Sequence, residues 1–163
     1  HTARGMGGCR MEAVIFCGIQ TAGKSSFYRE RFFRTHVRIS LDLLRTRHRE
    51  RLFLNTCLES GQRFVVDNTN PTRAERAVYI AAAKAKGFSV IGYHFSSPLE
   101  DALRRNAARE GVERVPDVAL RATLAKFERP LFGEGFDSLY EVRLSPEGFH
   151  VRERHHMEED HEF

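Results

Sequence analysis

The residues best suited to chemistry stand at positions 18–25, which read Gly18-Ile19-Gln20-Thr21-Ala22-Gly23-Lys24-Ser25 and complete a G-x-x-x-x-G-K-[ST] pattern. In such a phosphate loop, backbone N–H groups surround phosphate oxygens, the lysine contacts the terminal phosphates and the serine hydroxyl binds Mg²⁺. The apolar run 13–17 leads into the loop, and a helix starting at Lys24 would add the positive end of its dipole. We therefore predict that residues 18–26, Ser26 included, bind ATP or another nucleoside triphosphate together with Mg²⁺.

A second candidate is Asp67, which follows the apolar residues 64–66 and opens the segment Asp67-Asn68-Thr69-Asn70-Pro71. An acid directly after a buried strand is typical of a Walker B element, in which the carboxylate holds Mg²⁺ directly or through water. The segment is also compatible with a plain Asx-rich turn before a proline. Because a phosphate loop requires a partner acid on an adjacent strand, we expect Asp67 and Ser25 to form the metal site.

Asp42 and Arg45 follow another short apolar run, in the segment Ile39-Ser40-Leu41-Asp42-Leu43-Leu44-Arg45. We expect Asp42 in the first turn of a helix at the carboxyl edge of a sheet, with Arg45 one turn later. Asp42 could there accept the proton of an attacking hydroxyl. Alternatively, Asp42 only stabilises the helix N-terminus and Arg45 is its salt-bridge partner. Spacing leaves both interpretations open.

A cluster of arginines follows at 104–114, with Arg105 and Arg109 at i and i+4 on a helix expected to extend to Glu110. That spacing places both guanidinium groups on one helical face, and Gly111 and Pro116 interrupt the chain beyond it. Such a segment could close as a lid whose arginines stabilise charge on a transferred phosphoryl group. The alternative is an ordinary solvated basic face.

Strands and helices are expected to alternate along the chain. Hydrophobic runs and turn residues predict strands at 13–17, 37–39, 64–66, 88–95, 140–144 and 149–151. Helices are expected at 24–33, 41–60, 73–86, 98–110 and 116–127, with Thr72 and Ser97 as N-caps. This alternation predicts an α/β fold with a parallel sheet, helices on both faces and ligands at the carboxyl ends of the strands.

The 163 residues suffice for one domain, and 41% hydrophobic with 29% charged residues is typical of a globular protein. We expect a disordered leader or tag remnant at 1–10, the domain at 11–152 and a polar tail at 153–163. No run approaches a membrane span, and three cysteines without C-x-x-C spacing fit a reducing cytoplasm. Lysine occurs only at positions 24, 84, 86 and 126, so arginine supplies most cations; this favours an anionic substrate or reflects codon bias.

Together these segments resemble the kinase domain of the polynucleotide 5′-hydroxyl kinases. The likeness runs from about residue 13 to 144 and includes the phosphate loop, 39–45, 67–71, Arg105-Asn106-x-x-Arg109, Val115-Pro116 and Glu134-Gly135-Phe136. Two departures from it stand out: Thr21-Ala22 lies where relatives often have a second glycine and a small residue, and Ser26 replaces a commoner threonine. The resemblance implies a doubly wound, five-stranded parallel P-loop sheet of order 2-3-1-4-5 with a helical lid.

The resemblance also implies roles for the candidate residues. Lys24 and Ser25 would serve the triphosphate and Mg²⁺, and Arg105 and Arg109 would be lid arginines on the donor phosphates. Asp42 would be the general base, Arg45 would contact the acceptor's neighbouring phosphate, and Asp67 would organise the acceptor side near the metal. Lys24, Asp42 and Arg109 are thus the expected catalytic residues.

Three functions follow from these expectations. The first is a stand-alone kinase acting on the 5′-hydroxyl of DNA or RNA, and the second is a kinase for a small alcohol such as a nucleoside, sugar or antibiotic. The third is a nucleotide-binding ATPase module without an acceptor, which would not need the set Asp42, Arg45, Asp67 and Arg109.

Overall fold

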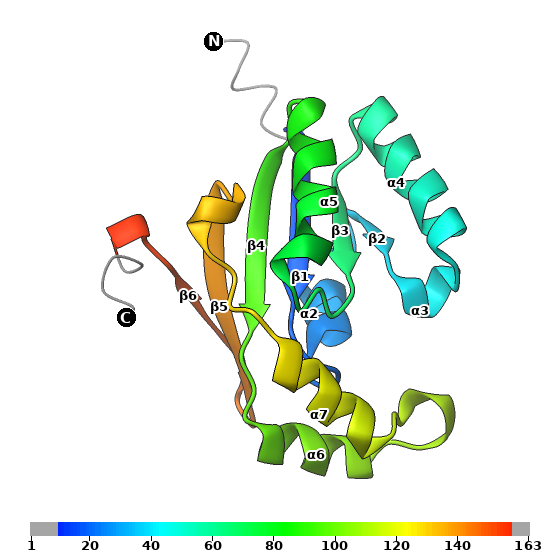
Figure 1. Cartoon of the computed structure of the whole chain (residues 1–163), viewed down its shortest axis with the longest axis vertical. Helices are drawn as coiled ribbons and strands as arrows, with labels where there is room; N and C mark the ends of the chain where they lie inside the picture. Colours follow the sequence, from blue (N-terminus) through cyan, green and yellow to red (C-terminus); the bar gives the residue numbers. More distant parts are fainter. Residues whose placement is uncertain (1–9, 158–163) are drawn as a thin grey trace.

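A six-stranded sheet forms the centre of the molecule in the computed structural model, which describes residues 10–157 (Figure 1). The strand order is β2-β3-β1-β4-β5-β6, and the strands are β1 (Glu12–Cys17), β2 (Val37–Ile39), β3 (Phe64–Asp67), β4 (Ser89–Phe95), β5 (Ser138–Ser145) and β6 (Gly148–Glu153). The first five are parallel and have the predicted order 2-3-1-4-5. The sheet has one strand more than the five expected, because β6, which includes the strand expected at 149–151, pairs antiparallel with β5 as a hairpin.

Helices cover both faces of this sheet, as the sequence predicts (Figure 1). The helices are α2 (Lys24–Arg31), α3 (Leu41–Leu44), α4 (Arg47–Ser60), α5 (Arg73–Ala85), α6 (Leu99–Ala107) and α7 (Asp117–Lys126), with short 3₁₀ helices at Gly111–Glu113 and Phe132–Glu134.

The core has two halves because successive side chains of a strand point to opposite faces. In β1, Ala13, Ile15 and Cys17 pack in one cluster with residues of α4 and α5. Val14 and Phe16 pack in a second cluster with residues of α2 and α6. Since β1 is buried on both faces and lies between β3 and β4, it fixes the phosphate loop at the carboxyl edge of the sheet.

Two of the predicted helices differ from the expectation by more than a turn end, namely those expected at 41–60 and 98–110. The helix expected at 41–60 is broken at Arg45, whose φ is +76°, and it restarts at Thr46, whose hydroxyl accepts a hydrogen bond from Arg49 N. The helix expected to reach Glu110 ends at Ala107. Ser97 does not cap it, because the helix begins after Pro98 and the Ser97 hydroxyl instead accepts a hydrogen bond from Arg105.

The chain end also differs from the expected polar tail at 153–163. Glu153 is the last residue of β6, and Arg154 is 1% exposed and donates a hydrogen bond to the carbonyl of Pro130. Residues 153 and 154 therefore belong to the folded domain. Residues 158–163 lie outside the described part, as do residues 1–9 of the expected leader. Between residues 10 and 157 no helix is long and apolar enough to cross a membrane.

Candidate active site

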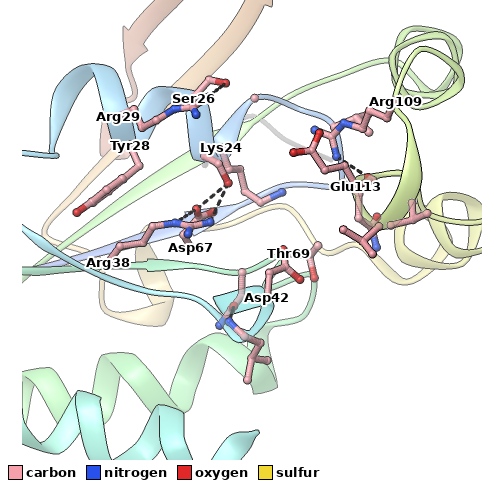
Figure 2. Close-up of a pocket in the computed structure, with 18 of the residues that line it drawn as sticks. Lys24, Ser26, Tyr28, Arg29, Arg38, Asp42, Asp67, Thr69, Arg109 and Glu113 are labelled. Carbon is pink, nitrogen blue, oxygen red and sulfur yellow. Dashed lines mark hydrogen bonds and ion pairs between the residues drawn. The ribbon is translucent and has the colours of Figure 1, made fainter. Parts of the chain in front are cut away.

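A cavity of about 900 Å³ lies at the carboxyl ends of the strands (Figure 2). Ten of the residues predicted from the sequence line it: Gln20, Thr21, Gly23, Lys24, Ser25, Ser26, Asp42, Arg45, Asp67 and Arg109. The fold thus gathers residues from the phosphate loop, from the loops after β2 and β3, and from the segment after α6 around one space. Gly18, Ile19, Ala22 and Arg105 do not line it.

The phosphate loop takes the backbone form that its glycines allow. Gly23 has a φ of +97° directly before α2, a conformation that L side chains rarely adopt. At Gly18 a Cβ atom would lie 2.8 Å from Cβ of Phe95, so β4 requires glycine there. Thr21 has a φ of +68°, which is uncommon for a β-branched residue, and its hydroxyl donates to the carbonyl of Ala102 at 3.0 Å. The departure from glycine at this position is therefore accommodated by a contact with α6.

Lys24 is buried within the loop that it follows. Its Nζ donates hydrogen bonds to the carbonyls of Gly18 and Ile19, both at 2.9 Å. Burial lowers the pKa of Lys24 to about 8, against the opposing influence of the Asp67 and Asp42 carboxylates. A lysine held inside its own loop is positioned to contact an anion that enters the loop.

Asp67, at the end of β3, is the acid that the sequence places near the metal. Its carboxylate is buried, with a side chain 2% exposed, and its Oδ2 accepts a hydrogen bond from the Ser25 hydroxyl at 3.0 Å. The same Oδ2 lies 2.8 Å from Nε of Arg38, and Nη2 of Arg38 donates to Ser25 Oγ at 3.0 Å. Arg38, which the sequence reasoning misses, thus bridges both expected metal ligands. The available signal is an arginine between two apolar residues of a three-residue strand.

The donor set at this point suits Mg²⁺, since a hydroxyl and a carboxylate are oxygen ligands. Ser25 and Asp67 together supply only two protein groups, and the described residues contain no cluster of three or more His, Cys, Asp or Glu side chains that could hold a metal ion. A metal at Ser25 and Asp67 would therefore take its other ligands from nucleotide phosphates and water.

Asp42 and Arg45 line the cavity from the two ends of the short helix α3, so they form a wall of it that is separate in sequence from the phosphate loop. Both side chains are exposed. The ion pairs of the described residues do not include one between them, because Arg45 leaves the helix with a positive φ instead of continuing it by a turn. The salt-bridge alternative is therefore not what the structure shows, and Asp42 remains open toward the cavity (Figure 2).

The segment after Asp67 connects this wall to the phosphate loop. Thr69 accepts a hydrogen bond through its carbonyl from Gly18 N at 2.9 Å, and the Asn70 side chain donates to the carbonyl of Phe16 at 2.8 Å. Asn68 turns the other way and accepts from Leu41 N, at the start of α3. This segment therefore contacts both walls of the cavity through its own backbone and amide groups.

The two candidate lid arginines occupy different places. Arg105, within α6, donates to the carbonyl of Thr21 at 3.3 Å and to the Ser97 hydroxyl, so it attaches α6 to the phosphate loop. Arg109 lies beyond the end of α6, and its Nη1 donates to the carbonyl of Glu113 at 3.2 Å. The expected common helical face is therefore wrong: only Arg109 faces the cavity.

Asn106 shapes the loop that carries Arg109. Its side chain is fully buried, donates to the carbonyl of Val115 and accepts from Val115 N at 3.0 Å. This double contact closes the loop between α6 and α7 on itself, with Arg109 and Glu113 on the cavity side (Figure 2).

Aromatic and basic side chains from α2 and the residues after it form the end of the cavity away from Arg109 (Figure 2). Tyr28, Arg29 and Arg38 line it with Phe33, a residue that is 68% exposed. An exposed aromatic ring near several arginines is a surface on which a nucleobase and phosphates can bind. These four residues belong to none of the motifs recognised in the sequence.

Comparisons with known proteins agree with this geometry. An AAA domain family model matches residues 49–130, which is half of the chain. The chain is 27% identical over 135 residues to the bifunctional polynucleotide phosphatase/kinase of Schizosaccharomyces pombe, a match covering 80% of this chain and 33% of that protein. The chain therefore spans about a third of the length of the curated relatives that it matches.

Solved structures show the same fold. Kti12 of Chaetomium thermophilum, in complex with ADP-AlF3, aligns with a TM-score of 0.61 at 14% identity, covering 80% of this chain and 88% of that one. A gluconokinase from Sinorhizobium meliloti 1021 aligns with a TM-score of 0.55 at 18% identity, covering 82% and 83%. With its phosphate loop at the edge of a 2-3-1-4-5 sheet, the chain belongs to the AAA domain family and has the fold of a P-loop kinase.

Proposed function

We propose that this chain transfers the γ-phosphoryl group of ATP to a hydroxyl, and that the acceptor is the 5′-hydroxyl end of a polynucleotide. The observation that carries the proposal is that Asp42 and Arg45, from the segment after β2, line the same cavity as the phosphate loop. A module that only binds or hydrolyses nucleotide has no need for an additional carboxylate and cation from that segment.

The proposed reaction assigns one task to each group. The acceptor oxygen attacks the γ-phosphorus, the bond to the β,γ-bridging oxygen breaks and ADP leaves. Asp42 takes the proton of the acceptor hydroxyl, Lys24 contacts the β- and γ-phosphates, and Arg109 meets the charge on the transferred group. Ser25 and Asp67 are the residues that would hold Mg²⁺, which would supply positive charge to the phosphates when bound with the nucleotide.

Two further observations support the polynucleotide acceptor over a small alcohol. Phe33 and Arg29 line the same cavity as Asp42, so a ligand larger than a single sugar has aromatic and basic side chains to contact. The curated relative that matches 80% of the chain is named as a polynucleotide phosphatase/kinase.

A panel of acceptors tests the proposal. We expect γ-labelled ATP with Mg²⁺ to label 5′-hydroxyl DNA or RNA oligonucleotides and to leave 5′-phosphorylated oligonucleotides unlabelled. A folded Lys24→Ala protein should lose the transfer. Labelling of a polyol, sugar acid or nucleoside in preference to every oligonucleotide would assign the chain to the small-molecule kinases instead.

A further inference from the structure

A buried carboxylate, that of Glu50, is connected through Asn68 to the helix α3 that carries Asp42, and it takes no part in the proposed reaction. Glu50, on α4, is 5% exposed. Its Oε1 accepts hydrogen bonds from the Tyr79 hydroxyl and from Nη1 of Arg47, both at 3.0 Å, and its Oε2 accepts from Nδ2 of Asn68 at 2.8 Å. Burial raises the pKa of Tyr79 to about 12, so its hydroxyl keeps the proton that it donates. A buried acid with three donors is a fixed structural anchor.

This anchor sets which way the Asn68 amide points. An ionised carboxylate can only accept hydrogen bonds, so the NH₂ group of Asn68 must face Glu50. The carbonyl oxygen of the same amide then points to the opposite side, where Oδ1 accepts a hydrogen bond from Leu41 N at 2.9 Å. Glu50 therefore determines that Asn68 presents an acceptor, and not a donor, to the backbone of α3.

Helix α3 depends on that acceptor. Its first backbone N–H groups have no partner within the helix, and the side chain of its N-cap residue, Ser40, makes no capping hydrogen bond. The Ser40 hydroxyl is buried and has no hydrogen-bond partner. Asn68, from the loop after β3, supplies the missing cap to a helix of only four residues. The residue after Leu41 is Asp42.

We propose that Glu50 and Asn68 are positioning residues that hold Asp42 at the acceptor through the cap on Leu41 N. The inference rests on the proposed function for the role of Asp42, but the contacts themselves do not. Displacing a reacting group by about 1 Å can slow catalysis about 100-fold. We therefore expect loss of the cap to lower the turnover number and to leave nucleotide affinity unchanged, because the phosphate loop is held by other contacts.

An exchange of the two polar groups provides the test. In Asn68→Asp, two carboxylates face each other and neither can donate. In Glu50→Gln, the amide of Gln can present its NH₂ group to the NH₂ group of Asn68, so the orientation of the Asn68 amide is no longer fixed. In the double variant E50Q/N68D, the glutamine NH₂ donates to the new carboxylate, whose second oxygen accepts from Leu41 N. The double variant should thus restore the cap that each single variant loses, and Asn68→Ala should lose it without rescue. Asn55→Ala, at an exposed position of the same helix as Glu50, is the control.

Two measurements distinguish the possible outcomes. Amide hydrogen exchange over residues 41–45 should be about tenfold faster in Asn68→Ala and in both single exchange variants, and should return to the wild-type rate in E50Q/N68D. Turnover should fall 10- to 100-fold in the same variants and recover in E50Q/N68D, with the dissociation constant for MgADP unchanged.

The capping role of Asn68 would be refuted if amide exchange at 41–45 were unchanged in Asn68→Ala. It would also be refuted if the effects of the two single exchanges on amide exchange added up in E50Q/N68D. Faster amide exchange with unchanged turnover would show that the cap forms but does not position Asp42 for catalysis. If the wild-type protein labels no acceptor, the proposed function fails while the exchange data still decide whether Glu50 and Asn68 control α3.

Discussion

The guanidinium of Arg38 lies 2.8 Å from Oδ2 of Asp67 and also donates to the Ser25 hydroxyl, so one arginine contacts both groups that are expected to bind Mg²⁺. Asp67 is almost fully buried, whereas the Arg38 side chain is 25% exposed. A cation at this place offsets the cost of burying the Asp67 carboxylate, and it competes with any other cation for the same oxygen.

Arg38→Met removes that competing cation. We expect Mn²⁺, measured by electron paramagnetic resonance in the presence of ADP, to bind several-fold more tightly to this variant. Without divalent ions the variant should be less stable by about 1–3 kcal/mol, because a buried carboxylate loses its charged partner, and added Mg²⁺ should restore part of the difference. Arg31→Met, which removes an arginine paired with Glu30 on α2, is the control. Weaker Mn²⁺ binding in Arg38→Met would mean that Arg38 orients Asp67 for the metal.

Lys24 predicts how nucleotide binding depends on pH. Its pKa of about 8 lies below the ordinary value of 10.5 because the side chain is buried. The lysine is therefore protonated below pH 8 and loses its proton as the pH rises through 8 in the free protein. Bound phosphates favour the protonated form, so ADP affinity should fall above pH 8, by up to roughly tenfold for each further pH unit.

Calorimetry in two buffers with different ionisation enthalpies measures the affinity for ADP and also the number of protons taken up on binding. At pH 9 we expect ADP binding to take up a proton, because Lys24 becomes protonated in the complex. The Lys24→Met variant should bind more weakly at all pH values and lack the proton uptake. Constant affinity between pH 7 and 9.5 in the wild-type protein would contradict the assigned contact of Lys24 with phosphate.

Arg109 should act on the transition state more than on the bound nucleotide. Arg109→Ala is expected to lower turnover by about 10³- to 10⁵-fold, as for other arginines that meet a transferring phosphoryl group, with a much smaller change in ADP affinity. Arg104→Ala is the matched control, since Arg104 pairs with Asp101 on the exposed side of α6 and does not line the cavity. Equal small losses in both variants would return Arg109 to a solvated basic surface.

Arg45 should recognise the phosphate on the 3′ side of the attacking hydroxyl. A nucleoside 3′-phosphate should then be a better acceptor than the nucleoside, by roughly 10- to 150-fold for one charge-assisted contact of about 1.5–3 kcal/mol. Arg45→Ala should remove this preference, whereas Arg51→Ala, exposed on α4 away from the cavity, should keep it. The ratio of acceptor efficiencies is the measurement, and equal use of both acceptors by the wild-type protein would argue against a polynucleotide.

The alternation of strands and helices and the place of the phosphate loop could be predicted because they depend on strong local patterns, whereas the strand order followed only from the resemblance to the polynucleotide 5′-hydroxyl kinases. The run at 13–17 is apolar on both faces, and the G-x-x-x-x-G-K-S pattern marks the turn that follows. The break at Arg45 could not be predicted, because a positive φ at an arginine has no signal in the sequence. The position of Arg109 outside the helix could not be predicted either, because α6 ends at Ala107 and alanine is a residue that favours helix continuation.

Hydrogen bonds between residues far apart in the chain could not be predicted from the sequence either. Glu50 and Asn68 are 18 positions apart, and Arg38 and Asp67 are 29 apart. Arg38 reaches Asp67 because β2 lies beside β3, and Glu50 reaches Asn68 because α4 packs on the face of the sheet that contains Phe64 and Val66 of β3. The pattern of charges along the chain does not indicate either proximity. The cavity residues that belong to recognisable motifs could thus be predicted, whereas Arg38 within β2 and Tyr28 and Arg29 on α2 could not.

The rate of label transfer from γ-labelled ATP to a 5′-hydroxyl oligonucleotide tests most directly whether Asp42 is the general base for a 5′-hydroxyl acceptor. We expect the wild-type protein to label the 5′ end. We expect Asp42→Asn to bind MgADP normally and to transfer about 10²- to 10⁴-fold more slowly. Transfer at the wild-type rate by a folded Asp42→Asn protein would show that Asp42 is not the base.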